Sequence, residues 1–225
     1  MLDFGYYNMD CMQGMAEFPD NYFNLAIVDP PYGIKQGGDK NHSRGCFAVS
    51  KNYHAFDDGE APDAEYFSEL RRVSRNQIIF GANHFIDKIP IPSSCWIVWD
   101  KENGKTDFAD CELAWTSFGS AVRKFTFRWQ GMLQGDMKNK EQRIHPTQKP
   151  VVLYKWILNN YAKEGDLILD THVGSASSLI ACEDLGFKYV GFEIDETYYK
   201  ESKARLNNHK AQITITELML DWRLP

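Results

Sequence analysis

A short stretch that follows an apolar run combines three kinds of residue that together could do chemistry. The segment "VDPPYG" (28–33) contains the carboxylate of Asp29, the consecutive prolines Pro30 and Pro31, and the ring of Tyr32. Each proline fixes φ at about −65° and has no N–H to donate, so the bend after Asp29 is rigid. A rigidly held carboxylate is a hydrogen-bond acceptor in a fixed position, and the neighbouring ring can stack on a flat ligand. An ordinary surface turn is the alternative.

A second stretch has the pattern of a nucleotide-binding βαβ unit. In "GDLILDTHVGSASSLIACEDLGFKYVGFEID" (165–195), an apolar run ends at Asp170, and small residues around Gly174 and Ser175 precede a helical pattern. The next apolar run closes with Glu193 and Asp195. An acidic residue roughly 20 positions after the turn can accept both hydroxyls of a ribose.

The ligand of this unit is not predicted to be a dinucleotide, because the fingerprint G-x-G-x-x-G is absent. Asp170 at the start of the turn favours a ligand whose tail carries positive charge rather than a pyrophosphate. S-adenosylmethionine, a nucleoside with an amino-acid tail, fits this description. A βαβ unit without any ligand is the alternative.

The elements that must position these two stretches alternate along the chain. Short apolar runs predict strands at residues 24–29, 77–82, 95–100, 111–118, 166–170 and 188–195. Helical spacing predicts helices at residues 63–76, 149–163, 177–186 and 196–209. Strands that are apolar throughout are typical of a sheet that is buried on both faces. We therefore predict an α/β fold in one domain spanning residues 1–225.

Two segments, 33–60 and 123–149, lack periodicity and predict long loops. In the second, seven lysines and arginines stand against two acidic residues, a local surplus of five positive charges. Phe125, Phe127 and Trp129 lie between these cations. The combination favours a nucleic-acid contact, in which cations meet phosphates and rings stack on bases or hold the loop down. A solvated surface loop is the alternative.

Composition excludes several classes of protein. With 43% hydrophobic and 25% charged residues the chain is typical of a globular protein, and a net charge of −6 argues against a general coat of nucleic-acid-binding charge. No leader pattern and no apolar run of roughly 20 residues is present, so we expect a cytoplasmic protein without a membrane segment. The five cysteines include no C-x-x-C pair, which is typical of reduced thiols and argues against a metal site.

Taken together, the motifs resemble one family. The segments "NLAIVDPPYG" (24–33), "RIHPTQKPVVLYKWILNNYAKEGDLILD" (143–170) and the βαβ unit, in this order, are similar to those of the beta-group amino DNA methyltransferases. These enzymes use S-adenosylmethionine and modify adenine at N6 or cytosine at N4. The resemblance covers most of residues 6–209. It implies a Rossmann-like domain with a mostly parallel sheet and a circularly permuted motif order, in which the strand before Asp10 lies beside the strand ending at Glu193.

The family's chemistry explains the residues of the first motif. An exocyclic amine is a poor nucleophile because its lone pair is delocalised into the base. The Asp29 carboxylate and the Pro30 carbonyl would accept hydrogen bonds from the amine and localise that pair. Tyr32 would stack on the base after it has left the duplex, since a base inside double-stranded DNA cannot be reached. Methyl transfer then depends on proximity and orientation.

The resemblance also implies a set of cofactor-binding residues. His145, Thr147, Gln148 and Lys149 would lie near the methionine end of the cofactor, where Thr147 and Lys149 could satisfy its carboxylate. Asp10 would accept from the cofactor's adenine amino group, although it is equally suited to cap a helix over residues 11–18. The full set is Asp10, Cys11, Asp29, His145, Thr147, Gln148, Lys149, Asp170, His172, Gly174, Ser175, Glu193 and Ile194.

The chain departs from the family in one motif. The usual D-P-F-x-G-S-G is "DTHVGSAS" here, so Thr171 and His172 replace a proline and an aromatic residue, and Ala176 replaces a glycine. We interpret His172 as a packing substitute rather than a catalyst. The departure also leaves open a relative that binds DNA without catalysis. Further segments resembling the family predict that Asn83, Trp99, Asp100 and Lys101 lie near the target pocket, although the aromatics among them could belong to the core.

Aspartate at the first position of D-P-P-Y favours an N6-adenine DNA methyltransferase, because the family's cytosine enzymes more often carry serine there. An N4-cytosine enzyme and a methyltransferase of structured RNA are the alternatives. We expect the loops at 33–60 and 123–147 to read double-stranded DNA, and a homodimer or a short target could supply specificity. The sequence leaves a cognate restriction nuclease open. The residues expected to contact DNA are Lys35, Arg44, Arg123, Arg128 and Lys138.

Overall fold

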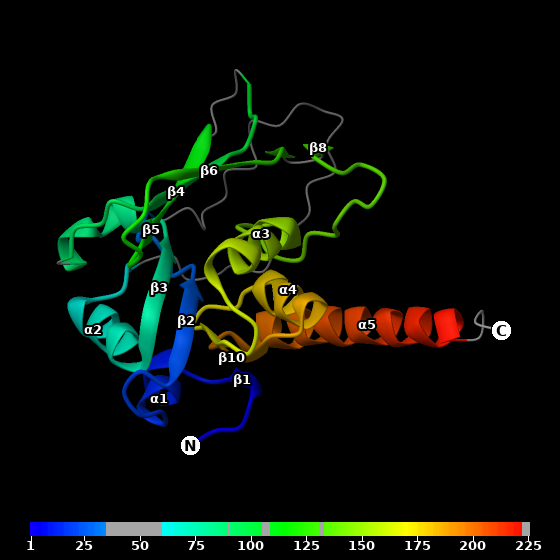
Figure 1. Ribbon diagram of the computed structural model, residues 1–225, viewed down its shortest axis with the longest axis horizontal. Helices are drawn as coiled ribbons and strands as arrows, with labels where there is room; N and C mark the ends of the chain where they lie inside the picture. Colours follow the sequence, from blue (N-terminus) through cyan, green and yellow to red (C-terminus); the bar gives the residue numbers. More distant parts are fainter. Residues whose placement is uncertain (35–59, 90, 105–108, 131–132, 222–225) are drawn as a thin grey trace.

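A sheet of eight strands, in the order β1-β10-β9-β2-β3-β5-β4-β6, organises the chain. The computed structural model describes residues 1–34, 60–89, 91–104, 109–130 and 133–221, and side chains up to residue 212 (Figure 1). The strands of the sheet are β1 (Gly5–Asn8), β2 (Phe23–Val28), β3 (Ser74–Phe80), β4 (Trp96–Asp100), β5 (Cys111–Thr116), β6 (Arg123–Thr126), β9 (Leu167–Asp170) and β10 (Lys188–Glu193). The two short strands β7 (Trp129–Gln130) and β8 (Leu133–Gln134) pair separately.

Helices cover both faces of the sheet. They are α1 (Cys11–Ala16), α2 (Ala64–Val73), α3 (Val151–Tyr161), α4 (Ser177–Leu185) and α5 (Glu196–Asp221), with the 3₁₀ turns η2 (Ala82–His84) and η3 (Ile86–Lys88) after β3. Side chains of α1 and α2 pack in one hydrophobic cluster, and those of α3, α4 and α5 pack in the other. Figure 1 shows the two groups of helices on opposite sides of the strands, and α5 continuing beyond the sheet toward the C-terminus.

The direction of the strands confirms the mostly parallel sheet. β1, β10, β9, β2 and β3 are parallel to one another, β5 runs antiparallel to both β3 and β4, and β6 is parallel to β4. β1 pairs directly with β10, with Asn8 opposite Glu193, although the two residues lie 185 positions apart. The permuted neighbourhood of the first and last strands is therefore confirmed.

Burial on both faces explains why the central strands are apolar. In β2, Leu25 and Ile27 belong to the cluster under α3 and α4, whereas Ala26 and Val28 belong to the cluster under α1 and α2. Successive side chains of a strand point to opposite faces, so a strand with helices on both sides must be apolar at every position. This is the pattern from which the strand was predicted.

The boundary between α2 and β3 differs from the prediction of a helix at 63–76. Asp63 caps α2 by accepting from the Tyr66 amide at 2.9 Å, but the helix ends at Val73. Ser74 is extended and already pairs with Phe23 of β2, while its hydroxyl donates to the Leu70 carbonyl. The strand therefore begins three residues earlier than its apolar run, because sheet pairing outweighs the helical pattern of polar residues.

The segment 123–149 is also more ordered than predicted. Residues 123–126 form the edge strand β6, and β7 and β8 form a small antiparallel pair. Phe125 packs against Trp156 of α3, and Trp129 is buried and donates to the Gln148 carbonyl at 2.7 Å. The rings thus anchor the segment to the body of the protein, one of the two roles predicted for them. In the described part of the chain, no helix has the length and apolar character needed to span a membrane.

Candidate active site

The residues predicted to take part in catalysis or cofactor binding lie along the carboxyl edge of the parallel strands. Asp29 follows β2, Asp170 ends β9 and Glu193 ends β10, and these three strands are consecutive neighbours in the sheet. Parallel strands bring their carboxyl ends to the same edge, which is where α/β proteins bind ligands. The D-P-P-Y motif and the glycine turn of the βαβ unit therefore lie on one side of the molecule, as the permuted order requires.

Asp29 is held from two sides. Its Oδ1 accepts a 2.8 Å hydrogen bond from the hydroxyl of Tyr32, and its Oδ2 lies 2.5 Å from Nζ of Lys149. Burial raises the pKa of the Asp29 carboxyl, and the nearby Lys149 charge opposes this rise. Each oxygen retains a second lone pair, so the carboxylate can still accept a hydrogen bond from a ligand.

The ring of Tyr32 is clamped between two segments. It stacks on the His84 ring with centroids 5.0 Å apart and an interplanar angle of 17°. On Gly81, which has φ +66°, an added Cβ would lie only 2.1 Å from the nearest ring atom. A side chain at position 81 would therefore displace Tyr32, and the positive φ is itself unfavourable for other residues.

Lys149 and Glu112 form a buried ion network that the sequence did not reveal. Nζ of Lys149 lies 3.1 Å from Oε2 of Glu112, and Glu112 also pairs with Lys101. Burial raises the pKa of Glu112, but the two lysines outweigh this and lower it to about 2. The four charges of Asp29, Lys149, Glu112 and Lys101 thus alternate in sign. Lys149, which resemblance placed at the cofactor's carboxylate, is in contact with the D-P-P-Y motif.

The neighbouring residues of the H-P-T-Q-K-P segment have structural partners. His145 is buried against the ring of Tyr198, and burial followed by the Lys149 charge lowers its pKa to about 4. The hydroxyl of exposed Thr147 lies 3.0 Å from the Nδ1 of His145. Gln148 accepts from the Ile144 amide and so closes the loop that precedes α3. Their contact with a cofactor stays a prediction.

The turn between β9 and α4 is tied together by carboxylates. Asp170 accepts from the His172 amide at 3.0 Å and from the hydroxyl of Ser178, and burial is the main reason why its pKa rises to about 7. Glu193 accepts from the amides of Gly174 at 2.8 Å and Asp195 at 3.0 Å. Ser175 is buried, whereas Ile194 is 70% exposed.

Two residues that depart from the family pattern have clear roles in this turn. Thr171 lies 2.6 Å from the hydroxyl of Tyr66 and 2.9 Å from Nδ1 of His172, and the rings of Tyr66 and His172 meet edge to face. Burial lowers the pKa of His172 to about 4, so its ring is neutral at pH 7. These contacts agree with the interpretation of His172 as a packing residue. Ala176 has φ +62°, a left-handed conformation that favours glycine.

Asp10 is placed at the start of α1, beside the end of β1. Its Oδ1 accepts from the Gln13 amide at 3.0 Å, so the predicted capping role is confirmed. Cys11 is partly exposed, and burial followed by the Asp10 charge raises the pKa of its thiol to about 12. Both residues lie at the same sheet edge as Glu193, which is opposite Asn8 in the neighbouring strand. Their predicted contact with a cofactor adenine stays a prediction.

The four residues expected near the target base have different surroundings in the structure. Trp99 is 1% exposed and donates to the Phe127 carbonyl, which agrees with the alternative that it belongs to the core. Asp100 pairs with Lys124 at 3.3 Å, and Asn83 is exposed in η2 beside His84. Lys101 contributes to the ion network around Glu112.

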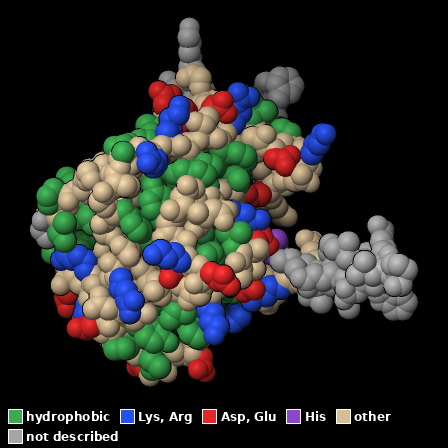
Figure 2. Space-filling view, in the orientation of Figure 1, with side chains coloured by type: hydrophobic (Ala, Val, Ile, Leu, Met, Phe, Trp, Pro, Cys, Tyr) green, Lys and Arg blue, Asp and Glu red, His purple; other side chains and the backbone are tan. Residues whose placement is uncertain are grey.

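The candidate DNA contacts lie in and around β6. Arg123, Arg128 and Lys138 are exposed, but Arg123 begins β6 and so lies toward the opposite end of the strand from the active edge. Figure 2 shows that the region over β4, β6 and β8 carries lysines and arginines mixed with acidic side chains. Lys35 and Arg44 lie outside the described residues.

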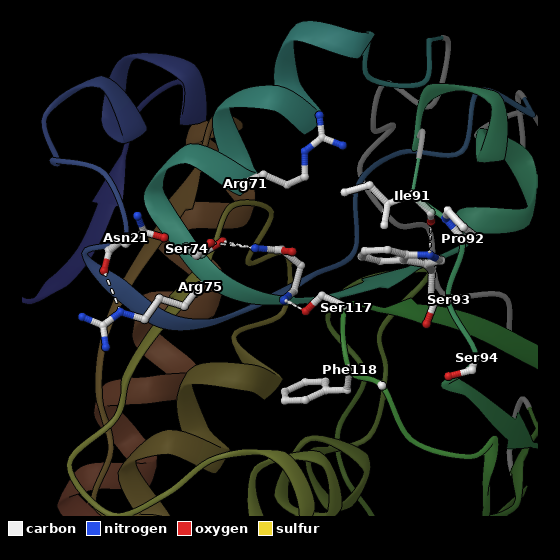
Figure 3. A pocket seen from close by; sticks show the side chains of 13 residues that line it. Asn21, Arg71, Ser74, Arg75, Ile91, Pro92, Ser93, Ser94, Ser117 and Phe118 are labelled. Carbon is white, nitrogen blue, oxygen red and sulfur yellow. Dashed lines mark hydrogen bonds between the residues drawn. The ribbon is translucent and has the colours of Figure 1, made fainter.

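One hollow in the described surface lies away from these residues. It has a volume of about 390 Å³ and is lined by residues such as Arg71, Arg75, Trp115, Ser117 and Phe118 (Figure 3). Arg75 is the second residue of β3 and Ser117 follows antiparallel β5, so the hollow opens at the amino end of the parallel strands. It is therefore on the opposite edge from Asp29 and is not part of the active site.

Comparison with known proteins decides the family. A model of the N6/N4 methyltransferases, described as DNA methylases, matches residues 86–204, more than half of the chain. The chain belongs to this family of DNA methylases. Among curated relatives, it is 26% identical to the Type II methyltransferase M2.MboI of Moraxella bovis over 90% of this chain and 87% of that protein. It is 23% identical to the Type II methyltransferase M.HinfI of Haemophilus influenzae, over 93% and 70%.

Solved structures of DNA methyltransferases share the fold of this family member. The M1.HpyAVI complex with S-adenosylmethionine is 22% identical, with a TM-score of 0.55 over 89% of this chain and 98% of that one. The cytosine-N4-specific PvuII methyltransferase is 12% identical, with a TM-score of 0.58 over 93% and 92%. The Rossmann-like methyltransferase fold implied by the motifs is thereby confirmed.

Proposed function

We propose that this DNA methylase transfers the methyl group of S-adenosylmethionine to the N6 amino group of an adenine flipped out of double-stranded DNA. The observation that carries the proposal is the position of Asp29, held by Tyr32 and Lys149 at the same sheet edge as the Asp170–Gly174 turn. An amine acceptor and a nucleoside-binding turn on one edge are the two halves of a methyl-transfer site.

The D-P-P-Y motif supports the amine chemistry. The Asp29 carboxylate and the Pro30 carbonyl accept hydrogen bonds from the adenine amine and localise its lone pair on nitrogen. Proline at both following positions fixes the bend, and the contacts of Asp29 fix its carboxylate. The methylated amine loses a proton readily, so Asp29 acts by orientation and electrostatics and does not have to be a strong base.

Tyr32 supports the recognition of a flipped base. Its ring is held on one side by Gly81 and stacks on His84, so its orientation is fixed before a base arrives. An aromatic face that is already held loses little freedom on stacking, which favours capture of a base that has left the duplex. The stacking of His84 on Tyr32 places η2 beside this ring, and both His84 and Asn83 are exposed.

The residues of the βαβ turn fit S-adenosylmethionine, which supplies an electrophilic methyl group on a sulfonium when it is bound. Glu193 keeps lone pairs for ribose hydroxyls while both of its oxygens are oriented by backbone amides. An added Cβ at Gly174 would come no closer than 4.0 Å to a neighbour, so the backbone there is open to a ligand. Asp10, and Asp170 in its ionised form, supply negative charge, which suits the cationic groups of the cofactor.

The choice of adenine rests on Asp29 in the first position of the motif. The fold does not decide between the two bases, because the PvuII structure that shares it is cytosine-N4-specific. The relatives named as Type II methyltransferases support a role in restriction and modification, and reading of the target by the loops at 33–60 and 123–147 belongs to the same proposal. A homodimer and a cognate nuclease stay predictions.

The test is to incubate the purified protein with S-adenosylmethionine and unmethylated duplex DNA, and to identify methylated nucleosides by mass spectrometry. We expect N6-methyladenine. N4-methylcytosine as the sole product would refute adenine specificity while leaving the family assignment intact. Methyl transfer to structured RNA but not to duplex DNA would refute the substrate class. Single-base sequencing of the methylated DNA would then identify the target sequence.

A further inference from the structure

The buried neighbourhood of Asp29 contains more negative than positive groups. Among the described residues, the ionisable side chains with an electrostatic interaction with Asp29 include Tyr32, Tyr66, Glu112, Lys149, Tyr154 and Asp170. Burial raises the pKa of each of the three tyrosines well above its usual value, so they are neutral. Among these described groups, Lys149 is the one cation.

The contacts of Lys149 are well suited to hold a carboxylate in place. Its side chain is 3% exposed, and its ammonium lies 2.5 Å from Asp29, 3.1 Å from Glu112 and 3.3 Å from the Tyr32 hydroxyl. The ammonium donates hydrogen bonds to the Asp29 carboxylate and the Tyr32 hydroxyl, and its contact with Glu112 is an ion pair. The Phe80 ring, 4.8 Å from the ammonium, excludes water on another side. Lys149 therefore has little freedom to turn away from Asp29.

Glu112 explains why a buried lysine is tolerated at this position. Burial lowers the pKa of a lysine, but the charges of Asp29 and Glu112 reverse this, so that the pKa of Lys149 is raised. Lys101 in turn pairs with Glu112, whose side chain is 22% exposed, at the more open end of the network. Each buried charge thus has an opposite neighbour, which a buried ion network requires.

Resting on the proposed amine methylation, we propose that Lys149 is a positioning residue for the transfer, which keeps Asp29 ionised and oriented toward the amine, while Glu112 and Lys101 hold Lys149 in place. Removing Lys149 would leave Asp29 buried with the like charges of Glu112 and Asp170. Burial and like charges favour the protonated carboxyl, which would lose acceptor strength toward the amine.

The proposal predicts how the pH dependence of the transfer rate changes in two variants. The quantity compared is the acid limb, the pH range over which the rate falls as the pH is lowered. Lys149→Met removes the cation but keeps the apolar stem, and should shift the limb to higher pH by about one to three units. Adding Glu112→Gln removes a neighbouring negative charge, so the limb should move back toward lower pH. The double variant should therefore transfer faster at pH 7 than Lys149→Met alone.

The measurement is single-turnover methyl transfer to unmethylated duplex DNA between pH 5.5 and 9, with S-adenosylmethionine binding followed by calorimetry. Lys155→Gln is the matched control, because Lys155 of α3 pairs with Asp184 of α4 at 2.6 Å and not with Asp29. Its limb should match the wild type. An unmoved limb in Lys149→Met, or a double variant slower at pH 7 than the single one, would overturn the proposal.

A second comparison applies if Lys149→Met alone does not bind the cofactor. The double variant removes one positive and one negative charge, and its limb should then lie at higher pH than that of Glu112→Gln; equal limbs would overturn the proposal. Asp29→Ala distinguishes a failure of the proposed function from a failure of the role proposed for Lys149. If that variant still transfers methyl groups, the proposed function itself fails. If it is inactive while the limbs of the lysine variants stay in place, only the role of Lys149 fails.

Discussion

The amide of Gly174 donates a 2.8 Å hydrogen bond to Oε2 of Glu193, and this bond joins the two ends of the βαβ unit. The amide of Asp195 binds the other oxygen at 3.0 Å. Both carboxylate oxygens are therefore oriented by the backbone, and each keeps a lone pair for a further donor. A pair of adjacent ribose hydroxyls matches this arrangement, because the carboxylate does not have to reorient when they bind.

Glu193→Gln should weaken S-adenosylmethionine binding by about 10- to 100-fold, because hydrogen bonds to a charged acceptor are worth about 1.5–3 kcal/mol. The introduced NH₂ group would also face a backbone N–H, where only an acceptor fits. Calorimetric titration with the cofactor measures the effect. A wild-type affinity in this variant would show that the carboxylate does not contact the ribose.

Asp29→Ala should lower the rate of methyl transfer by roughly 100-fold or more while leaving cofactor binding nearly unchanged. Asp29 follows β2, whereas Glu193, the carboxylate proposed to bind the ribose, ends β10, two strands away. Measuring the single-turnover rate and the cofactor affinity of the same protein separates the effect on methyl transfer from the effect on cofactor binding. Glu193→Gln is the reciprocal control, since it should affect binding first. Retention of the wild-type rate would remove Asp29 from the mechanism.

Gly81→Ala should slow transfer because the new Cβ meets the Tyr32 ring at 2.1 Å and displaces it. A misplacement of this size can cost roughly 100-fold in rate. Gly104→Ala is the matched control: Gly104 also has φ +66°, but nothing lies within 4 Å of an added Cβ. Both variants should lose about 1 kcal/mol of stability from the backbone, while only Gly81→Ala should lose activity. Equal rates in the two would show that the position of Tyr32 does not matter.

The central strands and both motifs could be predicted from sequence because their signals are local. β2 is apolar at each position that faces a helix layer, and the D-P-P-Y motif follows it directly. The edge strand β6 has no apolar run to predict it, because it begins with the exposed cations Arg123 and Lys124 and pairs with a strand on one side only. Ser74 was assigned to the helix because its pairing with Phe23 is a long-range contact.

Glu112 was missed for a related reason. It belongs to no motif, and its meaning depends on β5 lying antiparallel between β3 and β4. One local signal was available: Glu112 shares a strand face with Ala114 and Thr116, which are fully buried. A carboxylate on an inward face requires a cation, but the sequence does not show that the partner is Lys149, because the two meet only in the folded chain.

His145→Asn should make stability less dependent on pH between about 6.5 and 4. Burial lowers the pKa of His145 to about 4, so below its usual value of about 6.5 the unfolded chain binds a proton that the folded chain does not. The wild type therefore loses about 1–2 kcal/mol from this residue as the pH falls from 7 to 5. Asp170, whose pKa rises to about 7, changes the stability in the opposite direction in both proteins, so its contribution cancels in the comparison.

Urea unfolding at pH 7 and pH 5 measures the difference between wild type and His145→Asn, with exposed His84→Asn as control. Equal pH dependence in His145→Asn and wild type would contradict a buried neutral imidazole.

Ala176→Gly should stabilise the protein, although this substitution usually destabilises. Ala176 is buried with φ +62°, and its carbonyl accepts the first hydrogen bond of α4, from Ile180 at 2.9 Å. The left-handed conformation costs a non-glycine residue about 1–2 kcal/mol, whereas the greater freedom of glycine in the unfolded chain costs about 0.4–1 kcal/mol. The balance favours glycine by about 0.5–1 kcal/mol.

Ala181→Gly, five positions later and buried within α4, is the control and should destabilise, because a helical backbone offers no strain to relieve. Urea unfolding of the two variants at one pH compares them directly, and a loss of stability in both would show that the turn carries no strain at position 176.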